Sequence, residues 1–380
     1  MEKVCVVKCH EYKEEFMYQA LKEVLKEYNG IDSIIKPGQR VLLKVNLLMG
    51  KPPEAMVTTN PVFVKAICRL VKDAGAKPVI ADSPGGPFEK NLLRRAYRKS
   101  GLMAAAEESG AELNYNTGQK SISFEEGIYN RSFVFGEFAA DADAIINLPK
   151  LKTHGLTMIS AAVKNLFGVI PGLLKAEYHL RMQELEHFTK MLVELALCVK
   201  PQINIMDAII GMEGEGPSAG RPKKFGYILA SKSAAALDVA AANLMGITPV
   251  SKVPTIKAAG ELGLAKSMND ILLAGDELQV FNDTLIPSIE KKSNLLDRRL
   301  PGFLAKMLDP LLRPKPVFHH EKCVGCRDCY QSCPAGVIEM SNNRPEVELE
   351  GCIRCFCCQE LCQFQAVEIK RPLLSRLFLN

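Results

Sequence analysis

The chain has 380 residues and a formal net charge of +5, and it contains no run of five or more lysines and arginines, which argues against nucleic acid as a partner. Its hydrophobic content of 47% is ordinary for a globular protein, and no apolar stretch reaches the roughly eighteen residues that a membrane-spanning helix requires. The length leaves room for at least one large hydrophobic core besides any small module.

Apolar runs typical of strands alternate with helical patterns from the start of the chain to about residue 285. Residues 1–8 are too few and too charged for a signal peptide and predict a first strand, so we expect a cytoplasmic protein. Further strands are predicted at residues 40–46, 77–81, 144–147, 203–206 and 227–230, and helices at residues 61–75, 157–166, 183–198 and 234–244. The alternation predicts an α/β domain over residues 1–286, with a mostly parallel sheet covered by helices.

Polar side chains follow several of these strands at the edge where an open parallel sheet binds its ligands. The residues expected to bind a small anion such as a carboxylate or a phosphate are Lys44, Asn46, Ser83, Lys150, Lys152, Lys164 and Asn165. Asp82, His154 and Asp207 are candidate proton donors or acceptors. The alternative for each aspartate is a turn cap, and for the histidine a hydrogen bond to the backbone.

Two glycine-rich segments, residues 82–86 and 214–220, are candidates for cofactor loops. The first lacks both the G-x-G-x-x-G spacing and the Lys-Ser/Thr ending of a phosphate-binding loop. The second has one residue too many for the dinucleotide fingerprint, and a proline follows where a helix should begin. Neither segment supports a nucleotide site.

Eight cysteines near the end of the chain follow the spacing C-x2-C-x2-C-x3-C twice, over residues 323–333 and 352–362. This is the run of a bacterial two-cluster ferredoxin, in which the fourth cysteine of each run ligates the other cluster. We therefore expect two [4Fe-4S] clusters, one held by Cys323, Cys326, Cys329 and Cys362 and the other by Cys352, Cys355, Cys358 and Cys333. A zinc ribbon would leave half of these cysteines unexplained, and a disulfide framework would need a secretory signal.

The cysteine runs define a small α+β, bacterial ferredoxin-like domain over residues 319–370, followed by a tail over residues 371–380. Residues 287–318 form a basic connector, which we interpret as docking the acidic module in preference to an anionic membrane surface. Cys357 falls outside both runs and is interpreted as a spare thiol, and Gln363 stands where the first run has a proline.

Several motifs of the large domain resemble one known family. They include Asp82-Ser83-Pro84-Gly85-Gly86, Lys152-Thr153-His154 and Lys164-Asn165-Leu166-Phe167-Gly168, and together they resemble the family named domain of unknown function 362. Members of that family often carry a two-cluster ferredoxin module. The resemblance thus implies the same two-part architecture and implies no particular reaction.

Two classes of function remain open. In the first, the chain is an iron-sulfur oxidoreductase whose ferredoxin module exchanges electrons with a small anionic substrate in the α/β domain. In the second, it is an electron carrier or adaptor whose large domain docks a redox partner protein. A buried, lysine-rich cleft would favour the enzyme, and a flat apolar patch would favour the adaptor. A further cofactor, such as a flavin or a metal, is a third possibility.

Overall fold

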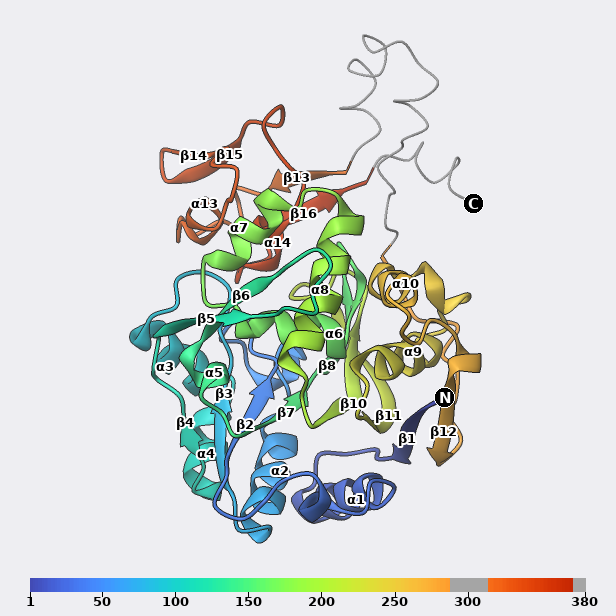
Figure 1. Ribbon diagram of the computed structural model, residues 1–380. Coiled ribbons are helices and arrows are strands. Elements are labelled where there is room, and N and C mark those ends of the chain that lie inside the picture. The colour runs from blue at the N-terminus through green and yellow to red at the C-terminus, as the bar shows by residue number, and fades with distance from the viewer. Residues whose placement is uncertain (288–313, 372–380) are drawn as a thin grey trace.

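The structure is a computed structural model that describes residues 1–287 and 314–371. Figure 1 shows a large α/β domain and, above it, a small module formed by the last described residues. Most of the predicted connector and all but the first residue of the predicted tail lie outside the described residues. The interpretation of the connector as a docking segment is therefore left as a prediction.

The large domain is built on one ten-stranded sheet. Its strands are β1 (Glu2–Lys8), β2 (Arg40–Val45), β3 (Lys77–Ala81), β4 (Glu112–Leu113), β7 (Ala144–Leu148), β8 (Lys150–His154), β9 (Met158–Ser160), β10 (Ile203–Glu213), β11 (Arg221–Ser231) and β12 (Ile271–Gly275). The order is β12-β1-β11-β10-β7-β2-β3-β4, with β8 beside β10 and β9 beside β8. The centre is parallel, because β2 runs parallel to β3 and β7, and β7 runs parallel to β10. β11 is antiparallel to both of its neighbours.

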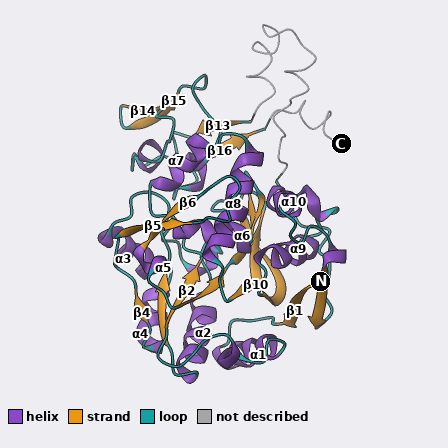
Figure 2. Ribbon diagram, in the orientation of Figure 1, coloured by secondary structure: helices purple, strands orange, loops and turns teal. Residues whose placement is uncertain are grey.

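Helices cover both faces of this sheet (Figure 2). They are α1 (Glu14–Lys26), α2 (Pro61–Asp73), α3 (Lys90–Lys99), α4 (Leu102–Ser109), α5 (Glu137–Ala140), α6 (Ala162–Asn165), α7 (Leu174–Arg181), α8 (Leu185–Val199), α9 (Ala234–Leu244) and α10 (Pro254–Glu261), with a hairpin of β5 (Gln119–Ser123) and β6 (Ser132–Gly136). Alternate residues of β2 enter different cores: Val41 and Leu43 pack with α1 and α2, whereas Leu42 packs with α8. This two-sided burial is typical of a parallel sheet and confirms the predicted α/β class.

The N-terminus of α2 shows why the local sequence was readable. The Asn60 side chain accepts the Val62 N–H at 2.9 Å, and Pro61 occupies the first helical position. The prediction of one helix over residues 157–166 was wrong in its first half. That segment forms β9, which pairs antiparallel with β8, and the helix begins at Ala162, whose N–H donates to the Asp238 carboxylate at 2.6 Å.

The small module contains β13 (Lys315–Phe318), α13 (Asp328–Gln331), β14 (Ile338–Ser341), β15 (Arg344–Val347), α14 (Cys357–Glu360) and β16 (Val367–Lys370). β13 pairs with β16 and β14 with β15, so residues 315–318, which we assigned to the connector, belong to a sheet of the module. The doubled spacing reappears in the backbone. Arg327 and Phe356, at equivalent positions before α13 and α14, have φ of 67° and 61°.

Candidate functional site

One set of cysteines surrounds a cavity in the small module. Cys323, Cys326, Cys329 and Cys362 line it, and apolar side chains such as Val367 fill the spaces between them. A [4Fe-4S] cube takes one cysteine at each iron, so its ligands must surround a space. Among the residues that the structure describes, no three His, Cys, Asp or Glu groups lie close enough together to hold a single metal ion. The arrangement of these four thiols fits a cube.

A second group of thiols lies on and just before α14: Cys358 belongs to this helix, and Cys352 and Cys355 precede it. Burial raises the pKa of Cys358 well above its usual value, and the charges of Cys355 and Cys352 raise it further. The charges of Cys329 and Cys333, both from the first run, act on Cys358 in the same way, and Cys333 also acts on Cys352. Because thiolates crowded at low dielectric repel one another, such a group is stable as thiolates when iron compensates the charge. This set also fits an iron-sulfur cluster.

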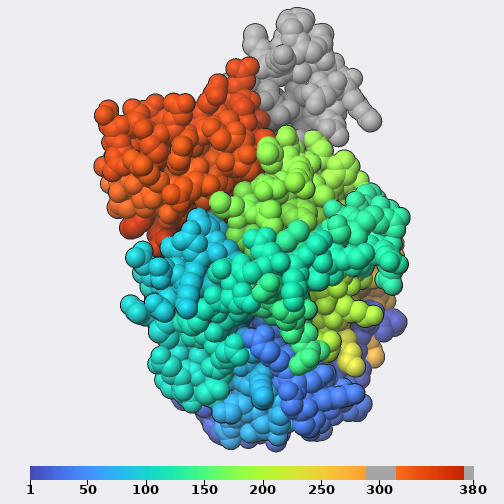
Figure 3. All heavy atoms as spheres, turned by 60° about the vertical axis from the view of Figure 1, so that its left-hand side comes forward, coloured from blue at the N-terminus to red at the C-terminus, as the bar shows by residue number. Residues whose placement is uncertain are grey.

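The small module rests on the edge of the large domain near the ends of the central strands (Figures 1 and 3). The Lys51 Nζ donates to the Gln363 carbonyl at 2.6 Å, and Arg371 pairs with Glu215 at 2.8 Å. Leu361 packs on Gly85 so closely that a Cβ on Gly85 would lie 2.1 Å from the leucine Cδ2. Polar contacts, among them one ion pair, and one close apolar contact therefore hold the module against the large domain.

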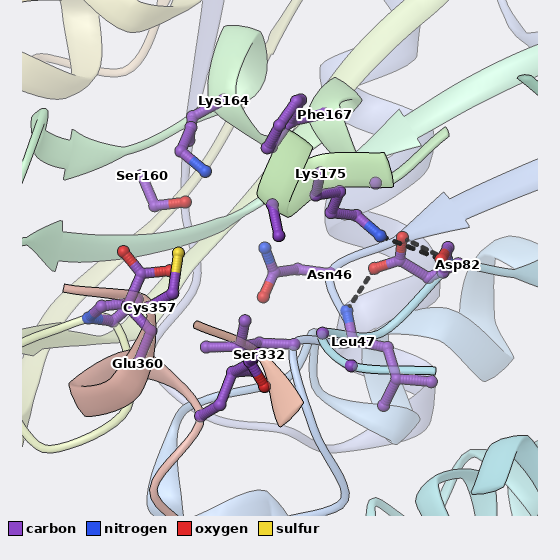
Figure 4. A pocket seen from close by; sticks show the side chains of 18 of the residues that line it. Asn46, Leu47, Asp82, Ser160, Lys164, Phe167, Lys175, Ser332, Cys357 and Glu360 are labelled. Carbon is purple, nitrogen blue, oxygen red and sulfur yellow. Dashed lines mark hydrogen bonds between the residues drawn. The ribbon is translucent and has the colours of Figure 1, made fainter. Parts of the chain in front are cut away.

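A cavity of about 100 Å³ lies between the two parts. Figure 4 shows side chains of both parts around this space, with Cys357 and Glu360 contributed by α14. The polar and charged lining residues of the large domain include Asn46, Asp82, Ser83, Lys152, His154, Lys164, Asn165, Lys175 and His179, and the module adds Ser332, Cys357 and Glu360. We refer to this space as the interface cavity. Most of the predicted anion-binding residues meet there.

Lysines dominate the electrostatics of the interface cavity. Lys164 lies over the Phe167 ring at 4.8 Å, and within the described part of the chain its ammonium group has no hydrogen bond or ion pair. Burial, followed by repulsion from Lys164, lowers the pKa of Lys152 to about 7. Burial likewise lowers the pKa of Lys175 to about 7. Burial also lowers the pKa of Lys164, so an anion bound among these three amines would favour their charged forms.

His154 and Glu360 meet at the boundary between the two parts. The His154 Nδ1 accepts the Leu156 N–H at 3.1 Å, so the proton of the neutral ring lies on Nε2, which is 3.2 Å from a Glu360 oxygen. Burial, followed by the charges of Lys164 and Lys152, lowers the pKa of His154 well below its usual value. Burial raises the pKa of Glu360. His154 is therefore a neutral hydrogen-bond donor at physiological pH.

Amide groups and an ion pair lie at the strand ends beside the interface cavity. Asp82 pairs with Lys44 at 2.8 Å and also accepts the Leu47 N–H at 2.6 Å (Figure 4). The Asn46 Nδ2 donates to Asn165, whose own Nδ2 donates to Asn147. Lys44 itself is fully buried behind Asp82 and does not line the space. These contacts hold the strand ends in place.

Lys150 and Asp207 lie apart from the interface cavity. They form a fully buried ion pair at 2.7 Å, and Asp207 also accepts the Tyr12 hydroxyl and the Asn60 N–H. The pair joins β8 and β10 to the start of α2 and to the segment before α1. The Asp207 carboxylate has its hydrogen-bond partners inside the fold, away from the interface cavity. We therefore do not propose Asp207 as a residue of the site.

Lys175, Glu360 and Cys357 are among the lining residues that were not predicted as part of a site. Lys175 lies on α7, whose pattern gave no signal, and its Nζ donates to the Ser83 hydroxyl at 2.9 Å. Glu360 enters the interface cavity only because the module docks there. Cys357 had one signal, its position outside the cysteine spacing, but we interpreted it as a spare thiol.

The fold and the cysteine sets define an α/β protein with a ferredoxin-type iron-sulfur module. A family model described as Domain of unknown function (DUF362) matches residues 41–243, and a model described as a 4Fe-4S dicluster domain matches residues 315–363. The chain therefore belongs to the DUF362 family, which confirms the resemblance in its motifs, and it carries an iron-sulfur domain at its C-terminal end.

Curated relatives agree with both parts. The thylakoid-associated protein sll1697 of Synechocystis sp. is 33% identical over 265 residues, which cover 70% of this chain and 80% of that protein. The pyruvate synthase subunit PorD of Methanocaldococcus jannaschii is 35% identical over 54 residues, 14% of this chain and 63% of that protein. A subunit of the ion-translocating oxidoreductase complex of Methanosarcina acetivorans is 35% identical over 48 residues, 13% of this chain and 18% of that protein.

These matches support iron-sulfur electron transfer as the coarse function of the chain. Within residues 1–287 and 314–371, no helix is both long and apolar enough to cross a lipid bilayer.

Proposed function

We propose that the chain is an iron-sulfur oxidoreductase that binds a small anionic substrate in the interface cavity. Two [4Fe-4S] clusters would be held by the two cysteine sets predicted from the spacing: Cys323, Cys326, Cys329 and Cys362, and Cys333, Cys352, Cys355 and Cys358. When bound, such clusters supply or accept electrons one at a time. The protein's own side chains would bind and orient the anion and move protons.

The observation that carries this proposal is the ammonium group of Lys164. It lies at the interface cavity without a polar partner among the described residues, and α14 of the redox module faces it. Burial lowers the pKa of Lys164, and an anion bound beside its partly exposed side chain would favour the charged form of the amine. The position that best suits a negatively charged ligand is therefore beside Lys164, next to the iron-sulfur module.

Lys152 is the group best suited to exchange a proton with the anion. Its Nζ donates to Asn46 Oδ1 at 2.7 Å and to the Val57 carbonyl at 2.8 Å, which leaves one of its three donors for a ligand. Its lowered pKa of about 7 lets both protonation states occur at neutral pH, as a general acid or base requires. We retain Asp82 as a second candidate, because it lines the space, and His154 as a hydrogen-bond donor.

The dimensions of the site limit the ligand. At about 100 Å³, the interface cavity is smaller than the roughly 300–1,000 Å³ of sites for drug-sized ligands and cofactors. It has room for an anion of a few heavy atoms, such as a short carboxylate or an inorganic oxyanion. A flavin or a metal as a further cofactor stays a prediction.

The alternative is a carrier or adaptor whose large domain docks a redox partner protein. A buried lysine-rich space is what an enzyme would require, and it supports the first class over the second. An external redox partner remains part of the proposal, because the clusters must exchange electrons with another protein. We propose the reducing cytoplasm as the compartment, since free thiols and iron-sulfur clusters persist there.

Electron exchange with candidate anions tests the proposal. Anaerobic protein would be prepared in its reduced and oxidised forms and mixed with formate, acetate, nitrite or sulfite, and the visible absorbance of the clusters followed. We expect one class of anion to change the cluster oxidation state in the wild type and to act far more slowly on Lys164→Gln. If every anion leaves the absorbance unchanged in both forms, the carrier function is favoured.

A further inference from the structure

Two residues by which the small module lines the interface cavity, Ser332 and Cys357, adjoin cysteines of one set. Ser332 lines the cavity and directly precedes Cys333, and Cys357 lines it between Cys355 and Cys358. Cys333, Cys355 and Cys358 belong, with Cys352, to the proposed set that we call the near set. The near set is therefore attached to the wall of the cavity through neighbouring residues of the same turns.

The other set, which we call the far set, comprises Cys323, Cys326, Cys329 and Cys362. It surrounds its own cavity, which is separate from the interface cavity. Cys326 is exposed, and Val324 and Phe364, which line the same space, are 55% and 46% exposed. The far set thus opens toward the surface of the module.

Leu361 is the residue of the interface cavity that adjoins the far set, since it precedes Cys362. Its side chain packs on Gly85, whereas the Cys362 sulfur accepts the Ala366 N–H at 3.2 Å and lines the other space. Leu361 and Cys362 therefore line different cavities, and Leu361 lies between the far set and the interface cavity.

Two lysines of the large domain lie beside different sets. Lys164 is close enough to Cys357 and Glu360 for their charges to act on it. Lys51 donates to the Gln363 carbonyl at 2.6 Å, and the charge of Cys362 acts on it. A positive charge stabilises the reduced form of a nearby cluster, and the effect weakens with distance. Each lysine therefore provides an electrostatic probe of one set.

We propose that the near set is the point at which electrons pass between the module and the bound anion, and that the far set is the point of exchange with an external one-electron carrier protein. Each transfer between the carrier and the two sets moves one electron, breaks no bond, and oxidises one centre as it reduces the next. The carrier is the reductant and the anion the oxidant, or the reverse. The inference rests on the cluster ligation proposed above and does not depend on the identity of the substrate.

Redox titration of the full chain, monitored by electron paramagnetic resonance without any added anion, tests the order of the two sets. Cys326→Ala retains the near set, and Cys355→Ala retains the far set. Each would be compared with and without Lys164→Gln. We expect Lys164→Gln to lower the midpoint potential of the near-set protein by at least twice the shift in the far-set protein, and Lys51→Gln to show the reverse preference.

Equal shifts in the two backgrounds, or a larger shift from Lys164→Gln in the far-set protein, would overturn the proposed order. If the cysteine variants lose both clusters, the two lysine variants would be titrated in the eight-cysteine chain. Shifts in two different redox transitions then support the proposal, and shifts in the same transition contradict it. Because no anion is present, failure here is distinct from failure of the enzyme proposal, which the anion panel tests.

Discussion

The strongest quantitative prediction concerns the pH dependence of anion binding. With a pKa of about 7, Lys152 is roughly 90% protonated at pH 6 and roughly 10% protonated at pH 8. If the anion binds the protonated form, the apparent Kd rises as the protonated fraction falls, by about tenfold between these pH values. Lys175 has a similar pKa of about 7, so a second contact from it would increase the change to about a hundredfold.

The assay is anaerobic titration calorimetry with the anion that the redox panel selects. The wild type should bind the anion more tightly at pH 6 than at pH 8. The pKa values of Lys152 and Lys175 are lowered, so both amines are mostly charged at the lower pH and mostly neutral at the higher one. Lys152→Gln should reduce the slope, and the double variant Lys152→Gln/Lys175→Gln should remove it. Lys120→Gln, which changes an exposed ion pair, is the matched control and should keep the full slope. A flat wild-type profile, or an unchanged slope in the double variant, would refute the reasoning.

Three other outcomes follow from the structure. Lys164→Gln should weaken anion binding by about 1.5–3 kcal/mol, or roughly 10- to 150-fold in Kd, the usual contribution of a hydrogen bond to a charged group, and calorimetry beside Lys120→Gln measures it. Cys326→Ala should remove about half of the iron while the thermal unfolding of the large domain stays unchanged. Loss of iron together with loss of the thermal stability of the large domain would show that the module is integral to the fold. Burial raises the pKa of Asp238 to about 7, so its contribution to stability is present below about pH 4 and is lost as the pH rises to about 7; Asp238→Asn should flatten that part of the urea-denaturation profile, and an unaltered profile would contradict the assignment.

Much of the fold could be predicted because its signals are local. The strand at residues 77–81 and the helix at residues 234–244 agree with β3 and α9 to the residue. Apolar runs, a proline at a helix start and a glycine at a helix end determine such elements without knowledge of their neighbours. The segment at residues 157–166 failed because its first part pairs with β8, a tertiary contact that periodicity does not record.

The candidate site was predictable where the topology alone brings residues together. The rule that ligands bind beyond the carboxyl ends of strands selected Asn46 and Asp82, which line the interface cavity. Of the lysines expected around those strand ends, Lys152 and Lys164 also line it, whereas Lys150, on the same face of β8 as Lys152 but about 7 Å back along the strand, pairs with Asp207. The rule does not resolve two residues of one strand.

The contribution of the small module was beyond prediction from sequence. Glu360 and Cys357 belong to a segment about two hundred residues away from the lysines that they face, and nothing in their local pattern indicates which surface the module docks on. The proposed cysteine ligands, in contrast, follow from spacing within eleven residues of each run. Local patterns indicated them, and no local pattern indicated the docking that brings the module to the interface cavity.

The central claim is that two clusters and a small anion are held by one chain. Native mass spectrometry of anaerobically purified protein, compared with the denatured mass, tests it most directly. We predict a surplus of two [4Fe-4S] clusters plus one small anion in the wild type, and of the two clusters alone in Lys164→Gln. Two clusters with no anion in the wild type, even after incubation with the panel of anions, would contradict the claim and leave an electron carrier.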